Sequence, residues 1–142
     1  MRSAGELLAL PIRHGDIELG RAVDVLLDLD AGRALGLEVR CRDDARRFLP
    51  FGAARLGPDG TQVGSPLALL DDLGFYRARG TGLRELRGTT VTQAGRPLGT
   101  FGDVLLTDAA AIAEVLVEGP RPVRVPYGPG LAFAGHRRVS AA

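Results

Sequence analysis

Short stretches in which apolar and polar residues alternate run along much of this chain. The clearest spans residues 35–41, which read Leu-Gly-Leu-Glu-Val-Arg-Cys. A period of two residues is typical of a strand with one buried and one exposed face. Residues 17–27 show a looser form of this period, and residues 47–51 predict a third strand. Glycine and proline lie between these stretches, as turns require. The pattern predicts an all-β protein of short strands.

One short helix is predicted among these strands. A proline–aspartate turn first predicts a hairpin over residues 53–63. Ser65 and Pro66 then mark a helix start, because a serine oxygen accepts from free N–H groups and proline suits the first helical position. We expect one or two helical turns over residues 67–73, ended by Gly74.

The chain repeats itself. Residues 6–29 resemble residues 85–108, and both contain Leu-Gly followed at the same spacing by Asp-Val-Leu-Leu. After a gap the similarity continues, with residues 38–39 expected to match 114–115 and residues 49–52 expected to match 125–128. Self-similarity of this kind sets the architecture. It predicts a first domain at 1–64, a linker with a short helix at 65–84 and a second domain at 85–142.

The repeat also decides an ambiguous segment. Residues 109–115 are rich in alanine and have high helix propensity. The repeat aligns them with the alternating strand of the first copy, and tertiary context commonly overrides propensity. We therefore expect residues 109–115 to be mainly strand, and residues 136–140 to close the second barrel.

The repeated pattern resembles the PRC-barrel family, which is named after the photosynthetic reaction-centre H subunit and a ribosome-maturation factor. The matching stretches are Gly15–Gly52 and Ala94–Gly128. The resemblance implies two tandem small antiparallel β-barrels joined by the linker helix. Members of this family share no known active site, so the resemblance implies binding or assembly and no enzymatic activity.

Four repeated residues have roles that a small barrel suggests. Gly20 and Gly99 lie inside strand patterns, where glycine permits a bend or bulge. Asp24 and Asp103 precede apolar runs, and we expect each to bond backbone groups at a turn or bulge. Leu19, Val25 and Leu27, with their counterparts Leu98, Val104 and Leu106, are expected to be buried.

The composition narrows the function classes. The net charge is +1, from 18 basic and 17 acidic residues. A charge this small provides no electrostatic field that would attract nucleic acid or anionic lipid. A single cysteine is typical of a reducing compartment, and we expect a cytoplasmic protein. No apolar stretch is long enough for a membrane span or a signal peptide, so no membrane insertion is expected.

The remaining candidates for chemistry predict no catalytic residue, no cofactor and no metal site. Cys41 lies on an apolar strand face, where we expect it to be buried without a cation beside it. His14 is expected in a turn and His136 on the surface. The pairs at 43–44 and 71–72 are expected to be solvated carboxylates, too few to hold a metal.

The densest basic cluster is the candidate partner-binding face. It contains Arg40, Arg42, Arg46 and Arg47 on one hairpin. Guanidinium groups there offer bidentate contacts to the carboxylates of a protein or to the phosphates of RNA. We expect a protein-binding adaptor, docking on a membrane-associated complex; the alternative is an RNA- or ribosome-linked assembly factor. The pattern identifies no particular partner.

Domains of this size bury little surface, so we expect the two domains to pack against each other or against a second copy of the chain. The linker supplies apolar residues for such a contact. The residues expected to pack there are Leu67, Leu69, Leu70, Leu73, Phe75 and Tyr76.

Overall fold

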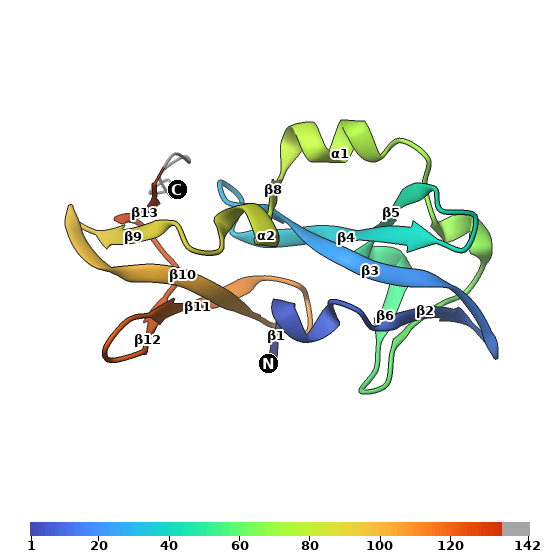
Figure 1. The fold of residues 1–142 in the computed structure, drawn as a ribbon, viewed down its shortest axis with the longest axis horizontal. Coiled ribbons are helices and arrows are strands. Elements are labelled where there is room, and N and C mark those ends of the chain that lie inside the picture. The colour runs from blue at the N-terminus through green and yellow to red at the C-terminus, as the bar shows by residue number, and fades with distance from the viewer. Residues whose placement is uncertain (135–142) are drawn as a thin grey trace.

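The computed structural model describes residues 1–134, which form two curled sheets, one in each half of the chain (Figure 1). The first sheet has the order β5-β4-β3-β2-β7-β6. Its strands are β2 (Pro11–His14), β3 (Ile17–Asp28), β4 (Arg33–Cys41), β5 (Arg46–Pro50), β6 (Ala54–Leu56) and β7 (Thr61–Val63). Its neighbours pair antiparallel except β2 and β7, which run parallel.

The second sheet has the order β12-β11-β10-β9-β13. Its strands are β9 (Thr90–Gln93), β10 (Arg96–Leu106), β11 (Ile112–Glu118), β12 (Val123–Pro126) and β13 (Leu131–Phe133). The prediction of an all-β fold with two barrel-like halves is confirmed. The closing strand predicted at 136–140 lies outside the described residues, as does His136. The predicted division at residues 64 and 84 stays a prediction.

Helical segments are short. The two α-helices are α1 (Leu73–Arg79) and α2 (Leu83–Leu86). Single 3₁₀ turns occur at Ala4–Leu7, Phe51–Ala53 and Pro66–Ala68. Figure 1 shows α1 lying over β4 and β5, on the outer side of the first sheet. No helix in the described part of the chain is long and apolar enough to cross a membrane.

The long strands β3 and β10 bend at equivalent places. Leu19 and Leu98 are skipped in the pairing with β2 and β9, so each forms a bulge. A Cβ at Gly20 would lie 2.4 Å from a carbonyl oxygen of β4, and one at Gly99 would lie 2.3 Å from a carbonyl oxygen of β11. Glycine permits this approach, so the predicted bends are confirmed. The bulges leave Leu19 and Leu98 only half-buried, and their predicted burial is wrong.

The strand pairing corrects one part of the predicted alignment. Residues 38–39 were expected to match 114–115. In the structure, Leu37 and Val115 hold the same place opposite the two long strands, so the prediction is wrong by two residues. The later strand ends match as predicted. The second copy therefore lost its residues in two separate turns, which a single gap could not represent.

Asp24 and Asp103 bond backbone groups, as predicted. Each carboxylate accepts the N–H of the next residue at 2.8 Å. Each also accepts from the helical turn at the start of the other repeat: Asp24 from Arg84 at 3.1 Å, and Asp103 from Gly5 at 3.0 Å. The short strand before each turn pairs with the same long strand, β8 (Thr81–Gly82) with β3 and β1 (Arg2–Ser3) with β10. The repeats thus exchange their first segments.

The repeats also meet at equivalent turns. The N–H of Ala34 donates to the oxygen of Ala110 at 2.8 Å, and the N–H of Ile112 donates to the oxygen of Gly32 at 2.8 Å. Ala34 and Ile112 hold equivalent positions in the two repeats, as do Gly32 and Ala110. Swapping the repeats therefore turns each of these hydrogen bonds into the other. The contact therefore has the approximate two-fold symmetry of a homodimer, within one chain.

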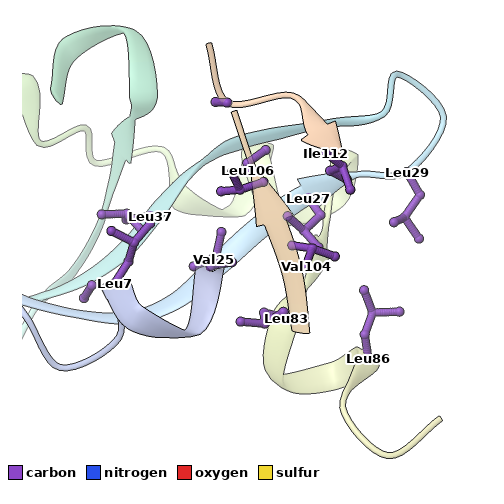
Figure 2. Packing of buried hydrophobic residues seen from close by; sticks show 14 of the residues in the cluster. Leu7, Val25, Leu27, Leu29, Leu37, Leu83, Leu86, Val104, Leu106 and Ile112 are labelled. Carbon is purple, nitrogen blue, oxygen red and sulfur yellow. The ribbon is translucent and has the colours of Figure 1, made fainter. Parts of the chain in front are cut away.

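One hydrophobic core runs through both halves. Figure 2 shows residues of β3 and β10 turned into the same interior. Val25, Leu27, Val104 and Leu106 are buried there, as predicted. The cores of the two halves are therefore continuous, while a smaller separate cluster of Leu26, Phe48 and Leu73 lies under the linker helix.

Residues 109–115 begin as a turn and end as a strand. The first residues are irregular, and Ala110 has a φ of 63°. From Ile112 onward the chain is β11. The prediction that 109–115 is mainly strand is confirmed, while residues 109 and 110 belong to the connection between β10 and β11.

The linker begins as predicted and then differs. The Ser65 hydroxyl oxygen accepts from the N–H of Leu67 at 3.1 Å, which confirms the cap. The turn that it caps ends at Ala68, however, and the main helix of the linker is α1. Gly74 lies inside α1, so the prediction that it ends the helix is wrong.

The linker packs on the outer face of the first sheet. Tyr76 stacks on Phe48 of β5, with ring centroids 3.8 Å apart. Leu70 exchanges two backbone hydrogen bonds with Phe48, at 2.9 and 2.8 Å. Leu67 and Phe75 are 86% and 50% exposed. Leu70, Leu73 and Tyr76 pack with Leu26 and Phe48 of the first sheet, so the prediction that the linker packs between the repeats is wrong for these five residues. Their contact with a second copy stays a prediction.

Candidate functional site

Two neighbouring hollows lie beside the first half of β3 and the end of β4, strands that Figure 1 places side by side. Their volumes are about 580 and 470 Å³, and both are lined by Glu18, Cys41 and Arg42. The first is also lined by Leu8, Ala9, Gly20, Arg21, Ala22, Val23, Arg40, Asp44 and Arg84. The second is also lined by Ile17, Leu19, Asp43, Arg47, Pro66, Leu67, Leu69 and Asp71. We call the two together the groove.

The bulge in β3 shapes the groove. Gly20 lies against β4, and the skipped Leu19 leaves its carbonyl oxygen free to accept the N–H of Arg42 at 3.2 Å. This hydrogen bond lies one residue beyond the end of β4. It fixes the backbone of Arg42, whose side chain lines both hollows. The floor is mainly apolar, while Ile17 and Leu67 project at one end with exposed fractions of 59% and 86%.

Three of the four predicted arginines reach the groove. Arg40 donates to Asp44 at 3.3 Å, and Arg47 donates to Asp43 at 3.1 Å and to Asp71 at 2.8 Å. These ion pairs are exposed, and their charges are largely neutralised locally. The pKa of Arg47 is raised above its usual range, first by Asp43 and then by the Cys41 thiol and Asp71.

Arg46 does not join them. It donates to Glu38 at 2.6 Å, on the face of the sheet that carries α1. Arg77 of α1 also donates to Glu38, through Nε at 2.8 Å. Glu38 is only 5% exposed, and the two guanidinium groups compensate its burial. Arg46 therefore shares Glu38 with Arg77 of the linker helix and lies away from the groove, and its contact with a partner stays a prediction.

Arg42 differs from its neighbours. It is exposed, and among the described residues its side chain has no hydrogen bond or ion pair. Five arginines and four carboxylates line the groove, so one positive charge is left over. Arg42 therefore carries a positive charge that no described carboxylate pairs with, and it lines both hollows.

Cys41 is buried as predicted, at 6% exposure. The expectation that no cation stands beside it is wrong, because Arg47 lies close enough for the thiol to raise its pKa. The sequence pattern placed Arg47 on another strand and could not show this cross-strand approach. The thiol forms part of the wall between the two hollows.

The second repeat has a more polar counterpart of the groove. A hollow of about 470 Å³ is lined there by Arg87, Phe101, Asp103 and Glu118, among others. Equivalent backbone bonds place Arg87 where the first repeat has Leu8. Arg87 donates to the oxygen of Gly102 at 3.2 Å and fills this space with a charge. The apolar groove is therefore a feature of the first repeat.

His14 lies outside the groove. His14 is the last residue of β2 and not a turn residue, so its predicted place is wrong by one residue; its Nδ1 lies 3.1 Å from the oxygen of Val63. Within residues 1–134, no group of three His, Cys, Asp or Glu side chains is placed to hold a metal.

Sequence reasoning missed Ile17, Leu67 and Arg84 as groove residues. Leu67 was hidden because it belongs to an apolar run that predicts a buried helix face. Ile17 is the first residue of β3, and the alternation of apolar and polar residues along a strand does not show which end of the strand other residues bury. Arg84 reaches the groove from the other repeat's first segment, a contact between residues far apart in the sequence.

Comparison with known proteins adds no assignment. No protein-family model matches the chain, and no curated protein matches it.

Proposed function

We propose that this chain is a non-enzymatic protein-binding adaptor and that the groove of the first repeat holds a segment of its partner. The observation that carries this proposal is the uncompensated Arg42 between two largely apolar hollows. Apolar surface supplies affinity, and a central arginine supplies orientation, in many protein interfaces. The resemblance to PRC barrels supports the same class of function, including docking on a membrane-associated complex.

RNA binding is the weaker alternative. Nucleic-acid sites need several cations free to meet successive phosphates. At this groove Arg40 and Arg47 already face carboxylates, which would repel a phosphate backbone. One free guanidinium is suited to a single anionic group on a protein.

A pull-down from the native cell with matched variants tests the proposal. The groove variant carries Arg42→Glu and Leu67→Glu. The control variant carries Arg121→Glu and Val123→Glu, which make the same change in charge and also remove an exposed apolar residue, but on the second repeat. Circular dichroism melts establish that both variants fold. We expect the groove variant to lose its partner and the control to keep it.

The other outcomes discriminate among the interpretations. Capture that survives in the folded groove variant would contradict the proposal. Capture that disappears after nuclease treatment would favour RNA. A partner recovered only from the solubilised membrane fraction would support docking on a membrane complex.

A further inference from the structure

The position of Arg42 restricts what the partner segment can look like. This inference rests on the proposed function. Arg42 lines both hollows, so a group bound to it has an apolar hollow on each side. Leu8 and Ala22 lie on one side, and Ile17 and Leu67 lie on the other. A segment that fills the groove therefore places a polar group in its middle and apolar groups at its two flanks.

The charges around Arg42 identify the polar group. Glu18 shares the boundary between the hollows, but Arg21 holds it in an ion pair at 3.1 Å. Arg40 is paired with Asp44, and Arg47 is paired with Asp43 and Asp71. Arg84, the fifth arginine, interacts electrostatically with Asp24 outside the groove. What remains for the partner is about one positive charge, on Arg42. A carboxylate matches it in charge and meets a guanidinium through two parallel bonds, whereas a phosphate brings nearly twice the charge.

We infer that the groove recognises a short extended protein segment in which one acidic side chain lies between two apolar side chains. In an extended chain, side chains two residues apart point to the same side. Three alternate residues can then meet the first hollow, Arg42 and the second hollow in order. The motif is apolar–any–acidic–any–apolar.

Titration of the full chain with defined peptides tests this inference. The probe is acetyl-Leu-Ala-Glu-Ala-Leu-amide, followed by two-dimensional NMR of the ¹⁵N-labelled protein, including the Nε–H of Arg42. One control peptide replaces glutamate by glutamine. The other has the same composition in the order Glu-Ala-Leu-Ala-Leu. We expect both controls to bind about tenfold more weakly, the usual scale of a lost charged hydrogen bond.

Two variants make the test specific to the groove. In Arg42→Gln, the preference for glutamate over glutamine should disappear, because the preference depends on the guanidinium. In Leu67→Ser, binding of the Leu-Ala-Glu-Ala-Leu peptide should weaken, while binding of a Leu-Ala-Glu-Ala-Ala peptide should not change. Leu67 is 86% exposed, so its loss leaves the fold intact.

Several results would overturn the inference. These are equal binding of the glutamate and glutamine peptides, an acid preference that persists in Arg42→Gln, and the absence of shifts at millimolar peptide. The failure of the inference is distinct from failure of the proposed function. If the pull-down depends on the groove but the peptides do not bind, the site stands and the motif is wrong. If capture is independent of the groove, the function itself fails.

Discussion

Individual carboxylates hold the two repeats together. Asp24 and Asp103 each accept two backbone N–H groups, one from the next residue of their own strand and one from the other repeat's first helical turn. A side-chain oxygen that satisfies such donors typically contributes about 1 kcal/mol. Burial also has an opposing effect: it raises the pKa of Asp24 despite the two hydrogen bonds, and the charge of Glu38 adds to the rise.

The raised pKa of Asp24 gives a prediction about pH. The folded chain binds the Asp24 proton more tightly than the unfolded chain does, so the stability linked to this group is fully present below pH 3.8. That stability is lost as pH rises through the higher folded pKa. The unfolding free energy of wild type minus that of Asp24→Asn should therefore decrease as pH rises from 3.8 through the higher folded pKa. Urea unfolding of both proteins at each pH measures this difference in free energy. A difference that stays constant or increases with pH would contradict a raised pKa for Asp24.

At the scale of elements, α1 is held to the first sheet by an aromatic stack and a buried ion pair. Phe48 is fully buried between Tyr76 and Leu26, while Glu38 receives Arg77 from the helix. The outer edge of β5 is closed by Leu70. In the second repeat the same edge is β12, which Pro122 precedes and Pro126 ends, with Val123, Arg124 and Val125 between the two prolines. Proline lacks an N–H group and so protects an open edge.

Replacing Phe48 should release this helix. Phe48→Ala removes a ring with no exposed surface, and a change of this kind costs about 3–5 kcal/mol. Phe75→Ala is the matched control, because that ring is 50% exposed and the loss should stay below about 1 kcal/mol. Chemical denaturation gives the free energies, and hydrogen exchange over residues 73–79 reports on the helix. Similar effects for the two variants would show that the stack does not hold α1.

The repeat made much of this element structure predictable. Gly20 and Gly99 marked the bends, and Asp24 and Asp103 marked the backbone bonds, because each appears twice at one spacing. The linker has no second copy, so the sequence could not say which way Leu67 points. Hydrophobic pattern says that a residue is apolar but not which surface covers it. The arginine cluster was visible locally, but Asp71 meets Arg47 from a distant part of the chain and left Arg42 as the unpaired member.

At the scale of the whole molecule, the two repeats behave as an intramolecular dimer that has exchanged its first segments. The strand β8 precedes the second repeat but pairs with β3 of the first, and β1 precedes the first repeat but pairs with β10 of the second. Together with the shared core, this arrangement means that unfolding one repeat removes a strand and a cap from the other. Folding of the two halves should be coupled.

A pair of equivalent core substitutions tests that coupling. Leu27 and Leu106 occupy the same place in the two repeats and are 0% and 2% exposed. Replacing either by alanine should cost about 2–5 kcal/mol. If the halves unfold together, each variant should give one calorimetric transition, lowered by roughly 10 °C, with equal calorimetric and van't Hoff enthalpies. If the halves are independent, each variant should instead split the transition and leave the untouched repeat at the wild-type temperature. A single lowered transition in both variants would therefore establish that the duplicated sequence folds as one cooperative unit.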